Sequence, residues 1–117
     1  VLALVDQLRE LSLRVGLLSN LATPTPWSKE LYHSGTADHF DVMLLSGETG
    51  FVKPEPEAFL MLADRLEVAP EELVFIDDTP EALSGVEKLG IRPIVYQGLS
   101  SLRSSLADLG ILLPTST

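Results

Sequence analysis

Two neighbouring carboxylates, Asp77 and Asp78, follow an apolar run in a stretch, 66–87, that contains no basic residue. Adjacent carboxylates without a local counter-charge suit a hard cation such as Mg²⁺, which prefers oxygen ligands. The alternative is structural, because Asp78 or Thr79 would also cap a helix that has Pro80 at its first position. The two interpretations are compatible, since capping needs only one of the side chains.

A single lysine and a Ser-Asn pair are the other candidates for chemistry. Lys53 is one of three lysines, and its ammonium suits a phosphoryl oxygen or a carboxylate, although a solvated lysine before a helix is the plain alternative. Ser19 and Asn20 offer a hydroxyl, an amide and backbone N–H groups, as a phosphate cradle does, but the same residue types also occupy ordinary turns. Ser19 lacks the flanking glycines of a nucleophile elbow, so we exclude it as a hydrolase nucleophile.

The histidines and the large aromatic residues carry a weaker signal. His33 and His39 have no carboxylate–histidine spacing typical of zinc, so we expect surface or core positions for them. Trp27, Tyr32 and Phe40 are expected to form core or subunit contacts rather than a stacking platform.

The candidate residues lie at the ends of predicted strands. Short apolar strands that alternate with helices of about ten residues predict an α/β fold, a Rossmann-like parallel sheet with helices on both faces. Ligands of such sheets bind beyond the carboxyl ends of the strands, which is where these residues fall. The predicted strands are 15–18, 40–45, 73–76 and 91–96, and the predicted helices are 1–13, 27–33, a helix beginning at 53–57 and ending near 66, 79–90 and 99–109.

Composition limits the classes of partner. The chain has 117 residues, 45% of them apolar, which is enough for one domain with a core. Its net charge of −9 repels phosphate backbones and anionic lipid, so we expect no nucleic-acid and no membrane partner. The absence of cysteine excludes disulfides, thiolate zinc sites and cysteine nucleophiles, and it is in accord with a cytoplasmic location.

Three segments, in this order, resemble motifs two, three and four of the haloacid dehalogenase (HAD) superfamily. They are Leu-Leu-Ser-Asn at 17–20, Gly-Phe-Val-Lys-Pro-Glu-Pro at 50–56 and Val-Phe-Ile-Asp-Asp-Thr-Pro at 74–80. The resemblance covers about residues 14–97 of the domain, 1–117, and implies the three-layer HAD-like core. It is greatest to small-molecule phosphatases with a helical cap inserted near the N-terminus, including the phosphatase domain of bifunctional epoxide hydrolases.

The resemblance also implies a role for each residue. Ser19 and Asn20 would bind the transferring phosphoryl group of a small phosphorylated metabolite, and Lys53 would neutralise it and steady the nucleophile. Asp77 and Asp78 would hold Mg²⁺, with Asp78 as the direct ligand. Dehalogenases of the superfamily work without metal and typically lack the paired aspartates, so the pair favours a magnesium-dependent phosphatase over the alternative, a metal-independent haloacid dehalogenase.

One motif of the family is missing from the sequence. The first motif, an Asp-x-Asp that supplies the nucleophile and the general acid, occurs nowhere in the chain, and neither does the substrate-selecting cap. Because the sequence opens at Val1 inside a predicted helix, we expect it to be the last part of the domain and inactive by itself. A non-catalytic binding or interaction module on the same scaffold is the alternative.

The missing motif has a structural counterpart. In the family the first strand lies centrally, between the strands that here end at Ser19 and Asp77. Its absence would leave two open strand edges with a groove between them, which is a hazard for association. We therefore expect the chain to be marginally stable or to self-associate through these edges.

Overall fold

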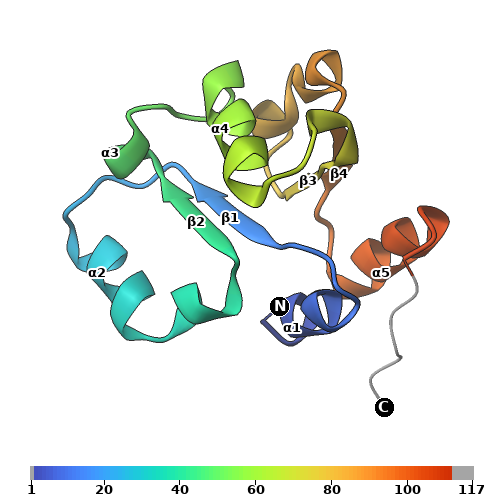
Figure 1. Ribbon diagram of the computed structural model, residues 1–117, viewed down its shortest axis with the longest axis horizontal. Coiled ribbons are helices and arrows are strands. Elements are labelled where there is room, and N and C mark those ends of the chain that lie inside the picture. Colours follow the sequence, from blue (N-terminus) through green and yellow to red (C-terminus); the bar gives the residue numbers. More distant parts are fainter. Residues whose placement is uncertain (1, 112–117) are drawn as a thin grey trace.

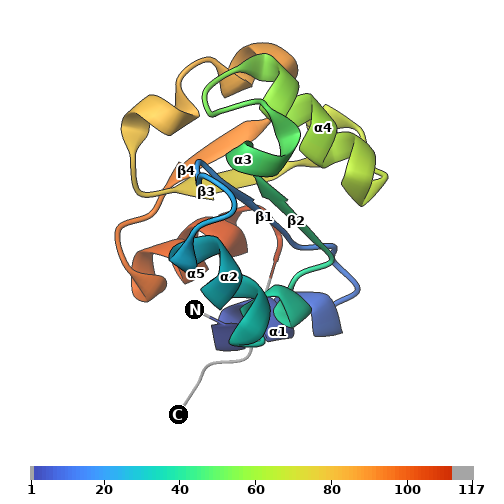
Figure 2. The same ribbon diagram turned by 90° about the vertical axis from the view of Figure 1, so that its left-hand side faces the viewer.

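The computed structural model describes residues 2–111 (Figures 1 and 2). The strands are β1 (Gly16–Ser19), β2 (Val42–Leu45), β3 (Val74–Asp77) and β4 (Arg92–Val95). The α-helices are α1 (Leu2–Glu10), α2 (Pro26–His33), α3 (Ser46–Thr49), α4 (Pro56–Leu66) and α5 (Leu99–Asp108). Short 3₁₀ helices are η1 (Thr36–His39), η2 (Pro70–Glu72), η3 (Pro80–Leu83) and η4 (Val86–Leu89).

The four strands form two separate parallel pairs. β1 lies beside β2 with Gly16 opposite Val42, and β3 lies beside β4 with Val74 opposite Arg92. Among the described residues no strand is hydrogen-bonded between β1 and β3. The α/β class and the parallel strands are confirmed, and the sheet is divided at the position expected from the family's strand order.

Each face of the strands has its own apolar core. Phe75 of β3 meets Phe59 of α4 edge to face, with ring centroids 4.9 Å apart and ring planes at 81°. The next residue, Ile76, packs on the opposite side with α1 and α5, because successive side chains of a strand alternate in direction. Figures 1 and 2 show α4 on one side of the strands and α1 and α5 on the other. The predicted three-layer arrangement is therefore confirmed.

An apolar groove lies between β1 and β3. It has a volume of about 230 Å³. Its lining comes from both strands and from the helices on both faces, and includes Leu8, Leu17, Leu62, Leu66, Ile76 and Leu106. The groove and the two unpaired strand edges are the features that the missing first strand predicts.

Residues near the N-termini of α4 and α2 explain where these two helices begin. Pro56 occupies the first turn of α4 and Glu57 adds an acidic side chain there, as the sequence predicts. α2 begins with a capping box, in which the Thr25 side chain accepts from Ser28 N–H and Ser28 Oγ accepts from Thr25 N–H.

Three expectations need correction. The predicted helix 79–90 is two 3₁₀ helices, η3 and η4, because Gly85 between them adopts the left-handed conformation, with φ of 84°. The segment 46–50, expected as a loop, contains the short helix α3. Trp27 and Tyr32 are 75% and 49% exposed, so a core position is wrong for both, while a subunit contact stays a prediction.

Two further points concern the ends and the surface of the chain. Val1, part of the first predicted helix, lies outside the described residues, and α1 begins at Leu2. Among residues 2–111, no helix is both long enough and apolar enough to cross a lipid bilayer.

Phe59→Ala tests the core that joins α4 to β3. The side chain is 1% exposed, so its removal should lower the free energy of unfolding by about 3–5 kcal/mol, measured by urea denaturation. Leu60→Ala in the same helix is the control, because Leu60 is 43% exposed and its loss should cost less than about 1 kcal/mol. Equal losses in the two variants would contradict the assignment of the core to this face of α4.

Candidate active site

One pocket contains every residue that the sequence singles out for chemistry. It has a volume of about 420 Å³ and lies at the carboxyl ends of β1 and β3. Ser19 is the last residue of β1, Asp77 is the last residue of β3, and Lys53 lies between α3 and α4. The full lining is Ser19, Asn20, Lys53, Pro54, Asp77, Asp78, Thr79, Glu81 and Ala82. Residues up to 63 positions apart in the sequence thus meet at one edge of the fold because parallel strands end there together.

Lys53 and Asp77 form a close, largely buried ion pair. Lys53 Nζ donates to Asp77 Oδ2 at 2.8 Å, and the two side chains are 13% and 11% exposed. The ammonium also lies 5.6 Å from the centroid of the Phe75 ring, within reach of a cation–π contact. The other oxygen, Asp77 Oδ1, accepts from Thr79 N–H at 3.0 Å. Both oxygens of Asp77 therefore have a partner in the protein.

The pKa of Asp77 reflects two opposing influences. Burial raises the pKa of the carboxyl, because it disfavours the charged form. The hydrogen bonds from Lys53 and from Thr79 N–H, and the positive charge of Lys53, outweigh burial and bring the pKa below its ordinary value. Asp77 is therefore a carboxylate at neutral pH, which keeps the ion pair intact.

Asp78 is more open than Asp77. Asp78 Oδ1 accepts from Thr79 Oγ1 at 3.1 Å, and Asp78 Oδ2 accepts from no described protein group. The capping alternative is wrong, because Thr79 precedes η3 without a capping hydrogen bond from its side chain. Within residues 2–111 no cluster of three or more potential ligand side chains exists, but Mg²⁺ is commonly held by one or two carboxylates and several waters. The exposed Asp78 carboxylate fits that chemistry.

Ser19 and Asn20 differ in how the protein uses them. Ser19 Oγ makes no hydrogen bond within the described part of the chain, so the hydroxyl is available to a ligand. The Asn20 amide is engaged at both atoms: Oδ1 accepts from Lys53 N–H at 2.8 Å, and Nδ2 donates to the Lys53 carbonyl at 3.1 Å.

The loop that carries Asn20 is packed tightly against α3. Leu21 O accepts from Gly47 N–H at 2.9 Å and from Ser46 Oγ at 3.3 Å. A Cβ at position 47 would collide with the backbone N of Thr23 and lie 2.9 Å from the carbonyl carbon of Ala22. Only glycine allows this approach, so Gly47 fixes the path of the chain just after β1.

Sequence reasoning missed three contributors to the pocket. Thr79, considered there only as a cap, donates to both neighbouring aspartates. Phe75 supplies the ring beneath the ammonium, and Glu81 adds a third carboxylate to the lining. The signal for Thr79 was its place directly after the aspartate pair, whereas nothing in the sequence indicates that Phe75 contacts Lys53.

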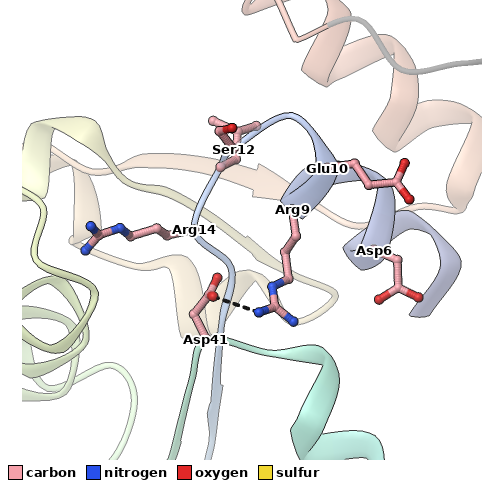
Figure 3. A pocket seen from close by; sticks show the side chains of 7 residues that line it. Asp6, Arg9, Glu10, Ser12, Arg14 and Asp41 are labelled. Atoms are coloured by element: carbon pink, nitrogen blue, oxygen red, sulfur yellow. Dashed lines mark ion pairs between the residues drawn. The ribbon is translucent and has the colours of Figure 1, made fainter.

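A second hollow lies at the opposite, amino-terminal end of β1 and β2. Figure 3 shows Arg9 of α1 reaching across it to Asp41, with Nη2 and Oδ1 3.1 Å apart. Its volume is about 610 Å³, larger than that of the pocket above, but none of the predicted site residues lines it. The lining is Asp6, Arg9, Glu10, Ser12, Leu13, Arg14 and Asp41.

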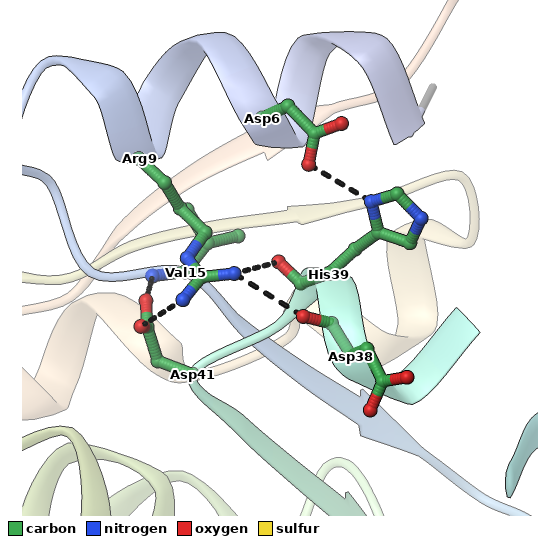
Figure 4. Close-up of polar contacts among 6 residues, drawn as sticks. All are labelled: Asp6, Arg9, Val15, Asp38, His39 and Asp41. Atoms are coloured by element: carbon green, nitrogen blue, oxygen red, sulfur yellow. Dashed lines mark hydrogen bonds and ion pairs between the residues drawn. The ribbon is translucent and has the colours of Figure 1, made fainter. Parts of the chain in front are cut away.

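The polar contacts beside this hollow fasten α1 to the strands (Figure 4). Arg9 Nη1 donates to the carbonyl of His39 at 3.0 Å, and Asp41 Oδ2 accepts from Val15 N–H at 2.7 Å. His39 Nδ1 lies 2.8 Å from Asp6 Oδ1, so this histidine has a carboxylate partner. The polar residues beside this hollow therefore have a structural role, because they connect α1 to the amino-terminal ends of β1 and β2.

Comparison with known proteins shows which families and structures the chain is similar to. A profile of haloacid dehalogenase-like hydrolases matches residues 1–90. The phosphoserine phosphatase of Thermus thermophilus is 35% identical over 99 residues, covering 83% of this chain and 39% of that protein. The phosphorylated carbohydrates phosphatase of Thermotoga maritima is 34% identical over 90 residues, covering 74% of this chain and 41% of that protein. The chain thus spans less than half the length of either relative.

A solved structure is similar over most of the chain. The HAD family enzyme of Bacteroides thetaiotaomicron, crystallised in complex with magnesium and inorganic phosphate, superposes with a TM-score of 0.71 at 31% identity. The match covers 82% of this chain and 50% of that protein.

Lys53→Met should raise the pKa of Asp77, because it removes the positive charge and one of the hydrogen bonds that lower this pKa. The effect of burial, which raises the pKa, is then less fully offset. A carboxyl with a depressed folded pKa stabilises the fold above the unfolded pKa of about 3.9 and loses that contribution as the pH falls through the folded value. The unfolding free energy of the variant should therefore fall less steeply between about pH 5 and pH 2.

The measurements are an NMR titration of the Asp77 carboxyl carbon and urea denaturation at each pH. Lys88→Met is the matched control, since Lys88 is an exposed lysine outside the pocket. An Asp77 pKa that is the same in the two variants would show that Lys53 does not hold the carboxylate.

Proposed function

Because the chain belongs to the haloacid dehalogenase-like hydrolase family, we propose that it forms the phosphate-binding part of a magnesium-dependent phosphatase acting on small phosphomonoesters. One observation carries the proposal. A free hydroxyl (Ser19), a fixed ammonium (Lys53) and an open carboxylate (Asp78) line a single pocket at the carboxyl ends of parallel strands. Phosphoryl transfer requires chiefly positioning and charge neutralisation, which these groups supply.

The charge of the pocket supports a role for a divalent cation. Lys53 is the only basic residue in the lining, which also contains the three acidic residues Asp77, Asp78 and Glu81. A phosphate dianion would be repelled by this net negative charge in the absence of a further cation. This requirement favours a magnesium-dependent phosphatase over a metal-independent dehalogenase.

Each group in the pocket has a distinct proposed role. Ser19 Oγ donates a hydrogen bond to a phosphoryl oxygen, and Lys53 Nζ neutralises charge on the transferring group while Asp77 holds the ammonium in place. Asp78 would hold Mg²⁺, which supplies electrostatic stabilisation of the phosphoryl oxygens when bound. Small phosphorylated compounds are the proposed substrates, on the basis of the phosphatases to which the chain is similar.

The nucleophile of the proposed reaction is not among these groups. In the family pattern an aspartate attacks phosphorus, the alcohol leaves, and water then cleaves the aspartyl-phosphate. Since no Asp-x-Asp motif occurs in the 117 residues, we propose that the chain by itself binds phosphate without turnover. The same absence favours the second candidate, a non-catalytic binding module.

Phosphate binding tests the proposal directly. Isothermal titration should detect binding of inorganic phosphate in the presence of Mg²⁺ and none in EDTA. Asp78→Ala should weaken Mg²⁺-dependent binding by at least about tenfold, as expected for loss of a metal contact. Glu81→Ala, which removes a carboxylate from the same pocket, should leave binding unchanged or tighter, because it only lowers the negative charge.

Two results would count against the proposal. Tighter phosphate binding in Asp78→Ala, as in Glu81→Ala, would mean that Asp78 acts by charge alone and not as a metal ligand. In the same samples an aryl phosphate should not be hydrolysed. Mg²⁺-dependent hydrolysis that is lost in Asp78→Ala would show that the chain is active without the missing motif.

We also propose that the open edges of β1 and β3 pair with a second copy of the chain, because the apolar groove between them exposes unpaired strand backbone. Sedimentation should show a mass that rises with concentration. Leu17→Lys places a charge in the groove and should shift the chain toward monomer, whereas Leu60→Lys on the exposed side of α4 should not. A stable monomer with sharp two-state melting would contradict this proposal.

A further inference from the structure

The main chain of Lys53 is held by one side chain. Asn20 Oδ1 accepts from the Lys53 N–H at 2.8 Å, and Asn20 Nδ2 donates to the Lys53 carbonyl at 3.1 Å. The two residues are 33 positions apart, so this contact joins the loop after β1 to the segment before α4. Within residues 2–111, no other hydrogen bond is made to the N–H or the carbonyl of Lys53.

A primary amide suits the two contacts. The side chain must present an acceptor to the N–H and a donor to the carbonyl of the same residue, and the carboxamide of Asn or Gln carries both side by side on one planar group. Asn20 is the only asparagine in the chain. Gln has the same amide on a longer stem, so it would not place both atoms at the same distance from β1.

The contact between Asn20 and Lys53 is part of a connection between the strand pair β1–β2 and the strand pair β3–β4. Asn20 follows β1, and the ammonium of Lys53 reaches Asp77 at the end of β3, although these two strands share no backbone hydrogen bond. Asn20, Lys53 and Asp77 thus form a continuous polar connection across the end of the groove. The position of the ammonium in the pocket depends on both ends of this connection.

We propose that Asn20 is a positioning residue, which fixes the backbone of Lys53 so that its ammonium lies beside the phosphoryl site, rather than a residue that binds phosphate with its own amide. The identity of the ligand as a phosphoryl group rests on the proposed function. The positioning of Lys53 by Asn20 does not depend on it. It replaces the role in phosphate binding that the family resemblance implies for Asn20.

Lysine acylation tests the positioning without reference to phosphate. The chain has only three lysines, so Lys29 and Lys88 are internal references for the modification of Lys53 by an N-hydroxysuccinimide ester, followed by mass spectrometry. Asn20→Ala should raise the rate at Lys53 relative to the references by at least about fivefold, the factor that one ordinary hydrogen bond represents. Asp77→Asn, which disrupts the partner of the ammonium directly, is the positive control. An unchanged ratio in Asn20→Ala would overturn the proposal.

A double-mutant cycle distinguishes positioning from direct contact. With inorganic phosphate and Mg²⁺, Asn20→Ala should weaken binding by about fivefold when Lys53 is present and should have no effect in the Lys53→Met background. An equal loss in both backgrounds would mean that Asn20 contacts phosphate itself, and it would overturn the proposal. If the unaltered chain binds no phosphate, the proposed function fails, and the acylation result alone decides the role of Asn20.

Two further variants keep the result interpretable if Asn20→Ala is poorly folded. Asn20→Asp has nearly the same shape and keeps the acceptor for the Lys53 N–H, but it sets an oxygen against the Lys53 carbonyl. Its acylation ratio should lie between those of the unaltered chain and Asn20→Ala, and a ratio equal to that of the unaltered chain would overturn the proposal. Ser104→Ala, an exposed polar residue of α5 outside the pocket, should match the unaltered chain in both assays.

Discussion

The Lys53 ammonium and the Asp77 carboxylate meet 2.8 Å apart, and much of the arrangement around the pocket depends on this contact. The strand pairs β1–β2 and β3–β4 share no backbone hydrogen bond, so other interactions must hold them together. On one face α4 holds the strand pairs together by apolar packing, chiefly of Phe59 against Phe75. At the carboxyl ends of the strands the ion pair holds them together by charge, and its ammonium lies close to the same Phe75 ring. Core and pocket are therefore adjacent parts of one connection between the two pairs.

Basic side chains are scarce in this acidic chain, and several serve as links between distant segments. Arg9 binds Asp41, and Arg14 Nη1 donates to the carbonyl of Leu66 at 2.6 Å, near the negative end of α4. Lys53 has the same kind of role but lies in a pocket with further carboxylates. Its charge is already matched by Asp77, so a dianionic ligand finds little uncompensated positive charge in the protein alone. This distribution of charge is the basis on which we propose a divalent cation for the pocket.

The meeting of Ser19, Lys53, Asp77 and Asp78 could be predicted because apolar strands followed by polar residues identify the carboxyl edge of a parallel sheet. The break of the helix predicted over 79–90 could not, since Gly85 is compatible with a helix until tertiary packing selects its left-handed conformation. The exposure of Trp27 and the bond between Asn20 and Lys53 also escaped prediction. Both depend on how segments far apart in the sequence approach each other, and local patterns carry no information on that distance.

The contacts at the two ends of β1 bear on how the strand is kept from slipping. A four-residue strand with one hydrogen-bonded neighbour has few ladder bonds to oppose a shift by one residue, which would reverse the direction of every side chain. Asp41 holds the N–H of Val15 just before the strand, and Asn20 holds Lys53 just after it. A one-residue slide would break both contacts and turn Leu18 out of the core. The side chains at the two ends of β1 thus oppose a shift in register, although the other edge of the strand has no hydrogen-bonded neighbour among the described residues.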